Sequence, residues 1–312
     1  MSKFDASLFS DVADALGISS PAIVEKDYYG VQLLVELNSL SFDGYTLVFS
    51  GGTCLAKTHQ ATHRMSEDVD IKLVALPETL ALANNQQRQR RRDIHQGLHR
   101  MLEASANFQL VGPAKKRNEG KYQQFLIQYP RQHAGMDALR PHLQLDITES
   151  LLFEPSVEKP IRSLYAEMAK LDDEILNMPC VTLASTASEK FVSLLRRTAA
   201  VYRDHSRVDD ETLVRHVYDL HVIGASLPTL KPLRDLVEQV IRIDVEQFGN
   251  QHEAFRRMPH QELRHGLRLL IENTQHKARY EKFIGPLVYH PSPASWDEAI
   301  ATVSTMSAEW LE

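Results

Sequence analysis

Two stretches in the first half of the chain alternate apolar and polar residues and predict β-strands. Residues 68–73 read DVDIKL, and residues 142–148 read HLQLDIT. Residues two apart on a strand point to the same face, so the apolar side chains enter a core while Asp68 and Asp70 project together from the other face. Asp146 takes the equivalent polar position on the second strand. The alternation therefore predicts three carboxylates on the polar sides of two strands.

A glycine turn and a helical segment precede the first of these strands. An apolar run predicts a strand over residues 45–50, which Gly51 and Gly52 follow. Glycines have no Cβ atom, so a phosphate can approach this backbone and the N–H groups of the next helix. Two adjacent carboxylates repel each other, but a divalent cation between them makes the pair favourable, since Mg²⁺ is held by a few carboxylates together with substrate phosphates. By pattern alone, Asp68 and Asp70 are either a metal site or the solvated edge of a sheet.

Helical spacing predicts other elements of the first half. Ser20 and Pro21 are suited to the N-cap and first turn of a helix that runs to about residue 40. A long polar helix is expected over residues 77–106, and a further strand over residues 122–129.

The second half of the chain is expected to be helical. Strand alternation stops after about residue 151, and Thr186 with Glu189 forms a capping-box pattern at the start of a helix. Amphipathic helices are expected over residues 231–248, 261–273 and 295–310. The predicted fold is therefore α/β, with a short mixed sheet in a domain of residues 1–165 and a helical C-terminal domain of residues 166–312.

Composition narrows the class of protein. With 312 residues, of which 43% are hydrophobic and 24% charged, the chain is globular and long enough for two domains. Two cysteines cannot build a disulfide framework, and without a Cys-x-x-Cys pair they do not indicate structural zinc, so a cytoplasmic location is expected. The sequence predicts neither a signal peptide nor a membrane span. The net charge of −6 argues against a uniformly basic nucleic-acid binder, although local basic patches remain compatible with it.

Ten residues around the glycine turn and the Asp-x-Asp strand match one sequence pattern at a fixed spacing. The set is Gly51, Gly52, Thr53, Leu55, Lys57, Arg64, Ser66, Glu67, Asp68 and Asp70. It resembles the signature of the AbiEii-type nucleotidyltransferase toxins, a branch of the polymerase-β-like nucleotidyltransferase superfamily in which a Gly-Gly or Gly-Ser turn precedes an Asp-x-Asp strand. The resemblance covers roughly residues 20–225 and implies a nucleotidyltransferase domain followed by a helical domain that completes the nucleotide site.

The resemblance also implies roles for single residues. Asp68, Asp70 and Asp146 would be catalytic carboxylates that hold Mg²⁺, since phosphoryl transfer with two metal ions uses acids to hold both. The nucleotide-binding positions would be Gly51, Gly52, Thr53, Lys57, Arg64, Ser66 and Lys190. For Asp146 the alternative is a surface aspartate near a strand end.

Two segments of the second half resemble further family motifs. The helix around Lys190 resembles the family's Glu-Lys helix, whose lysine faces the nucleotide, and this implies a catalytic role for Lys190. Residues 215–220 resemble the family's Arg-Asp-x-Tyr-Asp-Leu segment and imply a role for Asp219, but His216 replaces the first aspartate. This departure puts in doubt which acid completes the site. Without the resemblance, Lys190 would be a solvated lysine, and Arg215 and Asp219 an ion pair along one helix.

Three charged segments each admit two interpretations. Residues 86–92 contain four arginines within five positions, and residues 115–117 read KKR. Lys and Arg displace counterions from nucleic-acid phosphates, so both segments are candidate RNA contacts, and the alternative is a solvated surface. Residues 25–29, EKDYY, resemble a family block that packs beside the active-site sheet, and the alternative is the exposed face of a helix.

Taken together, the resemblance implies a Mg²⁺-dependent toxin of a toxin–antitoxin or abortive-infection pair. It would transfer a nucleotidyl group from an NTP to an acceptor such as tRNA, and a cognate antitoxin protein would be its partner. Two alternatives stay open. One is an enzyme that uses the same site on a small molecule or a protein, for which the basic segments would be dispensable. The other is a nucleotide- or RNA-binding module without chemistry, which the three candidate acids disfavour.

Overall fold

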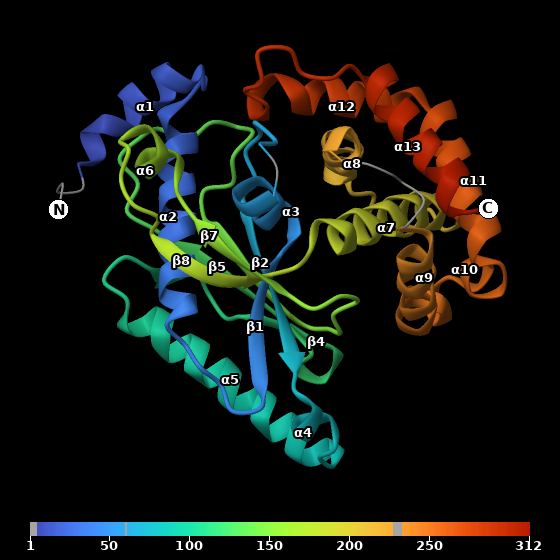
Figure 1. Cartoon of the computed structure of the whole chain (residues 1–312), viewed down its shortest axis with the longest axis horizontal. Helices are drawn as coiled ribbons and strands as arrows, with labels where there is room; N and C mark the ends of the chain where they lie inside the picture. The colour runs from blue at the N-terminus through green and yellow to red at the C-terminus, as the bar shows by residue number, and fades with distance from the viewer. Residues whose placement is uncertain (1–4, 60, 227–232) are drawn as a thin grey trace. The chain divides into compact units, whose positions relative to one another are not determined.

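The chain divides into two compact units after Val181. The computed structural model describes residues 5–59, 61–226 and 233–312. Unit 1, the part before this division, contains a mixed sheet with helices packed on it (Figure 1). Unit 2, the part after it, is helical. The α/β fold class expected from the sequence is confirmed.

The sheet of unit 1 has eight strands in the described residues. They are β1 (Tyr45–Ser50), β2 (Asp68–Ala75), β3 (Gln109–Leu110), β4 (Lys115–Arg117), β5 (Tyr122–Gln128), β6 (Leu143–Glu149), β7 (Val157–Ile161) and β8 (Ile175–Cys180). Their order is β3-β5-β6-β2-β1-β8-β7, and β4 pairs with β5. The pairs β2–β6 and β1–β8 are parallel, and the others are antiparallel. The strands expected near residues 45–50, 68–73, 122–129 and 142–148 are confirmed as β1, β2, β5 and β6.

The α-helices of unit 1 are α1 (Phe9–Leu16), α2 (Pro21–Asn38), α3 (Gly51–Cys54), α4 (Pro77–Leu80), α5 (Asn84–Ala104) and α6 (Leu164–Met168). The expected start of α2 is confirmed, because the Ser20 hydroxyl accepts the N–H of Ala22. The continuous helix expected over residues 77–106 is wrong. The side chain of Gln86 accepts the N–H of Ala83, and this cap starts a new helix after a break. Short helical turns also occur at Ala6–Leu8, Leu55–His59 and Asn118–Gly120.

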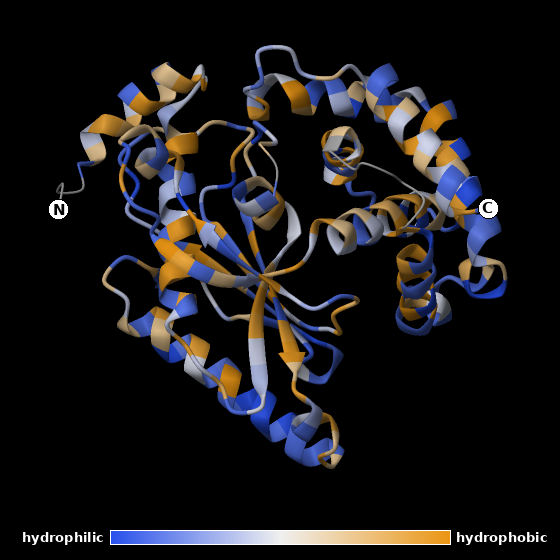
Figure 2. Cartoon of the chain, viewed as in Figure 1, coloured by the Kyte–Doolittle hydropathy of each residue, from blue (hydrophilic) through white to orange (hydrophobic). Residues whose placement is uncertain are grey.

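One hydrophobic core joins the sheet to its helices. The apolar residues of β2 and β6 that alternate with the carboxylates are buried in it, as predicted. The helix α5 adds Ile94, Leu98 and Leu102, which recur every four residues along one stripe. In Figure 2 the central strands are largely hydrophobic, whereas the end of α5 next to α4 is hydrophilic. The alternation along β2 and β6 therefore separates a buried apolar face from a polar face.

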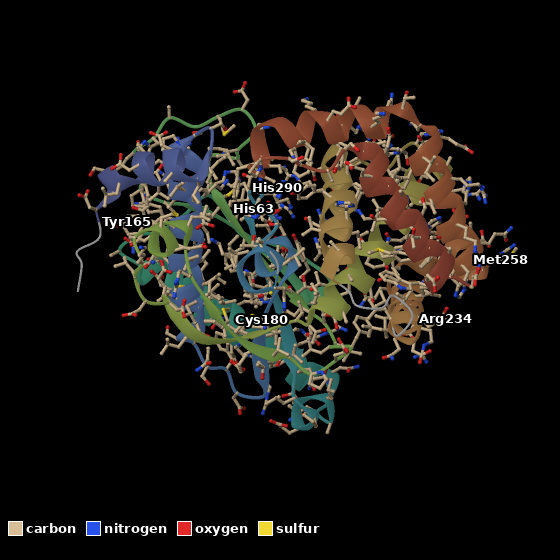
Figure 3. The ribbon with its side chains drawn as sticks, turned by 45° about the horizontal axis from the view of Figure 1, so that its top comes forward. His63, Tyr165, Cys180, Arg234, Met258 and His290 are labelled. Carbon is tan, nitrogen blue, oxygen red and sulfur yellow. The ribbon has the colours of Figure 1, made fainter. Side chains whose placement is uncertain are left out.

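The division between the units falls after Val181, later than the expected boundary at residue 165. The expectation that strands end near residue 151 is wrong, since β7 and β8 extend the sheet. Phe49 of β1 pairs in parallel with Cys180 of β8, which is buried within unit 1 (Figure 3). Pro160 and Pro179 lie within these two strands. Proline removes a ladder N–H and interrupts the strand pattern, so the sequence hides both strands.

The α-helices of unit 2 are α7 (Leu183–Arg203), α8 (Arg215–Ser226), α9 (Arg234–Phe248), α10 (Glu253–Arg257), α11 (Pro259–Glu272), α12 (Thr274–Leu287) and α13 (Trp296–Trp310). Short 3-10 turns occur at Glu211–Val214 and Gly249–Gln251. The helices α9, α11 and α13 confirm the expected ones, although residues 231 and 232 lie outside the described residues. The expected cap of the first helix is wrong. Thr182 caps α7 by accepting the N–H of Ser185, and Thr186 lies inside the helix. Among the described helices, none has the length and apolar character needed to cross a membrane.

Candidate active site

The three predicted carboxylates of unit 1 lie on neighbouring strands. β2 and β6 pair in parallel, with Asp70 opposite Asp146 and Asp68 opposite Gln144. Paired residues share a face of the sheet, and residues two apart on one strand do as well. Ser50, the last residue of β1, lies opposite Asp70 on its other side. The structure therefore brings Asp68, Asp70 and Asp146 to one polar face beside the end of β1.

The glycine turn lies directly against this face. Gly51 has a φ of +78°, and a Cβ atom there would lie 2.0 Å from Oδ2 of Asp70. A Cβ atom at Gly52 would lie 2.8 Å from both Nη2 of Arg64 and Oγ of Ser66. Any larger residue at either position would displace one of these groups. The two glycines thus allow a carboxylate and a guanidinium to pack against the turn.

Two other predicted nucleotide-binding residues have partners within the scaffold of unit 1. The hydroxyl of Thr53 donates to the carbonyl oxygen of Asp68, which ties the turn to β2. Lys57 forms an ion pair with Asp27 of α2, and the same carboxylate accepts the N–H of Leu164. The geometry therefore gives Thr53 and Lys57 structural contacts.

Asp146 is oriented by three side chains that the sequence did not single out. Tyr122 Oη and Gln124 Nε2 donate to its Oδ1 at 2.9 and 3.0 Å, and Gln144 Nε2 donates to its Oδ2 at 2.8 Å. Burial and the neighbouring Asp146 charge raise the pKa of Tyr122, so this hydroxyl remains a donor at neutral pH. The carboxylate of Asp146 is therefore held in a fixed orientation.

Asp68 is held by Arg140, from the loop before β6. Arg140 Nη2 lies 2.5 Å from Oδ1 of Asp68, and its Nη1 donates to Oε1 of Gln144 at 2.7 Å. Burial raises the pKa of Asp68 and the charge of Asp146 adds to this, while the Arg140 guanidinium opposes both. Arg140 thus bridges the carboxylate of β2 and the amide that orients Asp146.

A buried ion pair holds the loop that carries Arg140. Lys26 Nζ lies 2.6 Å from Oε2 of Glu67 and donates to the carbonyl oxygen of Arg140 at 2.8 Å. The same Glu67 oxygen accepts the N–H of Arg140 at 2.8 Å. Burial raises the pKa of Glu67, but the Lys26 ammonium together with the charge and the N–H of Arg140 outweighs it, and the net shift is downward. The pair therefore links α2 to the residue preceding Asp68.

The charged block at residues 25–29 does not form an exposed helix face. Glu25 is fully buried, and its carboxylate accepts the backbone N–H groups of Gln132 and His133 at 2.7 and 3.3 Å. Lys26 is 1% exposed. The block fastens α2 to the loop between β5 and β6, as the family interpretation of these residues expected.

Sequence periodicity could have identified only some of the residues that orient Asp146 and Asp68. Gln144 stands two positions before Asp146, so strand periodicity alone places it on the same face. Gln124 lies opposite Asp146 only because of the register between β5 and β6. Arg140 belongs to a loop with no periodicity. Neither a strand register nor a loop path can be read from local sequence.

The metal site predicted at Asp68, Asp70 and Asp146 stays a prediction. Within the described ranges, no three His, Cys, Asp or Glu side chains are arranged to hold a metal ion. Asp68 is paired with Arg140, which leaves Asp70 and Asp146 as the facing pair. Mg²⁺ is usually held by one or two carboxylates together with substrate phosphates. The donor set of Asp70 and Asp146 fits that type of site.

Lys190 and Asp219, both predicted from the sequence, meet within unit 2. Lys190 Nζ lies 2.9 Å from Oδ2 of Asp219, and both residues are buried. The interpretation of Lys190 as a solvated lysine is therefore wrong. The guanidinium of Arg215 lies 5.7 Å from the ring centroid of Phe283. The ion pair joins α7 to α8.

Comparisons with known proteins identify the family of this chain. The family model described as nucleotidyl transferase AbiEii toxin, type IV toxin–antitoxin system, matches residues 32–302. This match covers most of the chain, which therefore belongs to the AbiEii family of nucleotidyltransferase toxins. Membership implies an NTP substrate and an antitoxin partner, and nucleotidyltransferases generally use a divalent metal ion.

One solved structure with a similar fold is MenT4, a nucleotidyltransferase toxin from Mycobacterium tuberculosis H37Rv. The two chains superpose with a TM-score of 0.61 and 18% sequence identity, over 99% of this chain and 90% of MenT4. At this identity the similarity shows a shared fold. A comparison with curated protein sequences gives no match.

Proposed function

We propose that this toxin transfers a nucleotidyl group from an NTP to an RNA acceptor, with tRNA as the expected class, and that Mg²⁺ is its metal ion. The observation that supports this is the pairing of Asp70 with Asp146 beside the Gly51-Gly52 turn. Facing carboxylates at the end of a phosphate-accessible turn are suited to a metal-bound triphosphate. We place the activity in the cytoplasm, since free, buried Cys54 and Cys180 suit a reducing compartment.

In this proposal Asp70 and Asp146 hold Mg²⁺, with Asp68 as the third acid. The ion would offset phosphate charge and lower the pKa of the attacking hydroxyl. The protein's own contribution is orientation. Gln144 fixes one oxygen of Asp146, and Arg140 carries a positive charge beside Asp68. Both groups are therefore in place before the substrates bind, which lowers the cost of reaching the reactive geometry.

The glycine turn would receive the triphosphate in this proposal. Gly51 and Gly52 would supply backbone N–H groups, while Thr53, Arg64 and Ser66 would line the approach. Arg64 is 4% exposed, with Nη1 donating to the carbonyl oxygen of Met65 at 2.8 Å, so its charge is fixed beneath the turn. A fixed guanidinium supports anion binding with little loss of side-chain entropy.

Two lysines would contact the phosphates only by competing with carboxylates. Lys57 is paired with Asp27, and Lys190 is paired with Asp219. A triphosphate carries more charge than a single carboxylate, so it can draw a lysine away from such a partner. We propose that Lys190 makes this exchange and that Asp219 holds the lysine until the nucleotide binds.

The test is transfer of label from each of the four α-labelled NTPs to total RNA in the presence of Mg²⁺. Asp70→Asn and Asp146→Asn should each abolish transfer, with circular dichroism showing an intact fold. Asp93→Asn is the matched control, because this exposed aspartate on α5 accepts only from Gln89 among the hydrogen bonds of the described residues. Transfer by Asp70→Asn at the wild-type rate would refute the assignment. Label recovered in protein or small molecules instead of RNA would refute the acceptor class.

A further inference from the structure

The arginine-rich segment of α5 is not a uniform basic surface. Arg90 pairs with Asp43 at 2.8 Å and donates to the Thr79 hydroxyl at 2.8 Å, so it ties α5 to the neighbouring turn. Arg91 is buried and lies 2.8 Å from Glu149 of β6. These two arginines therefore have structural roles, and only part of the segment faces a possible ligand.

Arg88, Arg91 and Arg92 line a pocket of about 310 Å³ between α5 and the connection from β4 to β5. Its charged and titratable lining comes from Arg88, Arg91, Arg92, His95, Lys116 and Glu119. Glu119 offsets Arg88 and Glu149 offsets Arg91, so two positive charges remain, those of Arg92 and Lys116. We call this the α5–β4 pocket. Such a concave, positively charged site suits a phosphate group.

Two of the cations are available to a ligand. Arg88 pairs with Glu119, which also lines the pocket. Arg92 and Lys116 are exposed, and no ion pair joins either of them to another of the described residues. The electrostatics of His95 agree with an electropositive interior. Burial, together with the charges of Lys116 and Arg91, lowers the pKa of this histidine to about 4.

The position of β4 connects the pocket with the candidate active site. In this edge strand, Lys116 pairs with Gln123 and Arg117 pairs with Tyr122 of β5. Successive strand residues point to opposite faces, so Lys116 and Arg117 lie on opposite sides of the sheet. The guanidinium of Arg117 lies 5.9 Å from the Tyr122 ring centroid, and the hydroxyl of this tyrosine donates to Asp146. One strand therefore separates the pocket from the carboxylates.

We propose that the α5–β4 pocket binds a backbone phosphate of the acceptor RNA, so that the RNA chain runs past β4 and the end of the RNA reaches Asp146. This inference rests on the proposed transfer to RNA. A single NTP at the Gly51-Gly52 turn would leave the pocket empty, because none of the residues that line the pocket belongs to that turn. A polynucleotide repeats its phosphates and can occupy both places, and phosphate contacts are what position a nucleic acid.

The test measures binding of labelled tRNA, without NTP, as a function of salt concentration. The double variant Arg92→Gln/Lys116→Gln should weaken binding about tenfold and reduce the slope of log Kd against log salt by about 1.4, which is ~0.7 for each lost contact to a single strand. Arg100→Gln is the matched control, because it removes one exposed charge from the same helix outside the pocket. The charge-preserving variant Arg92→Lys/Lys116→Arg should retain the wild-type slope.

Other outcomes separate the possible ligands. An unchanged slope in the double variant would overturn the proposal. Calorimetric titration with inorganic phosphate provides the second arm. If the double variant loses phosphate binding but keeps tRNA binding, the pocket is a site for free phosphate and the RNA assignment is wrong. If wild-type protein binds tRNA through the pocket and labels no RNA, the proposed function fails while the pocket assignment stands.

Discussion

Replacing Lys26 by methionine should destabilise unit 1 because it leaves a buried carboxylate without its main partner. The side chain of Lys26 is fully buried and that of Glu67 is 2% exposed. Breaking a buried pair by removing one partner costs about 3–5 kcal/mol. Glu67 would keep the N–H of Arg140 at 2.8 Å and its guanidinium Nε at 3.7 Å. These remaining contacts put the expected loss at the lower end, about 3 kcal/mol at neutral pH.

A double-mutant cycle isolates the ion pair from the loss of packing. Lys26→Met/Glu67→Leu removes both charges, so it should lose less stability than the sum of Lys26→Met and Glu67→Leu. We expect a coupling of about 2 kcal/mol, within the range for residues in one network. Because methionine is close to lysine in shape, most of the effect of the first change is electrostatic.

The assay must report on unit 1. Both tryptophans, Trp296 and Trp310, lie in unit 2, so tryptophan fluorescence follows that unit. Hydrogen exchange of peptides from β2 and β6 in increasing urea follows unit 1 directly. A loss below about 1 kcal/mol for Lys26→Met, or additivity in the cycle, would refute the view that this pair holds the Arg140 loop.

Further predictions concern a glycine, a histidine and a lysine. Gly51→Ala should abolish transfer, because its Cβ atom would lie 2.0 Å from an active-site carboxylate at a φ of +78°. The control Gly30→Ala lies inside α2, where the added Cβ atom meets nothing within 4 Å, and it should stabilise the protein by about 1 kcal/mol. Equal activity of the two variants would contradict this prediction. The folded-state pKa of His95, about 4, lies below its ordinary 6.5, so the unfolded chain binds the proton first as pH falls and stability is lost between pH 6.5 and 4. Between pH 7 and pH 4, the free energy of unfolding measured in urea should therefore fall by about 3 kcal/mol less in His95→Gln than in the wild type. An unchanged pH dependence would count against this prediction. Lys190→Met should destabilise unit 2 by about 3 kcal/mol, because it removes the ammonium group that pairs with the buried Asp219. Tryptophan fluorescence during unfolding measures this loss. Wild-type unfolding of this variant would show that the pair adds no stability.

The sequence by itself determined the elements that carry the site. Period-two alternation along β2 and β6 assigned Asp68, Asp70 and Asp146 to polar faces, because side-chain direction on a strand depends only on residue parity. The glycine turn was equally local, since the positive φ of Gly51 requires that residue type. The resemblance to the AbiEii-type family began with the same stretch, and the family match over residues 32–302 shows membership.

Tertiary structure decided which of these side chains meet. The pairing of Asp70 with Asp146 depends on the register of two strands that are far apart in sequence. The burial of Lys26 against Glu67 depends on where α2 packs, and the same charged sequence on an exposed helix would be solvated. Arg140 reaches Asp68 along a loop without regular structure. Periodicity reports the direction of a side chain relative to its own backbone, whereas register, burial and loop path arise from contacts between distant segments.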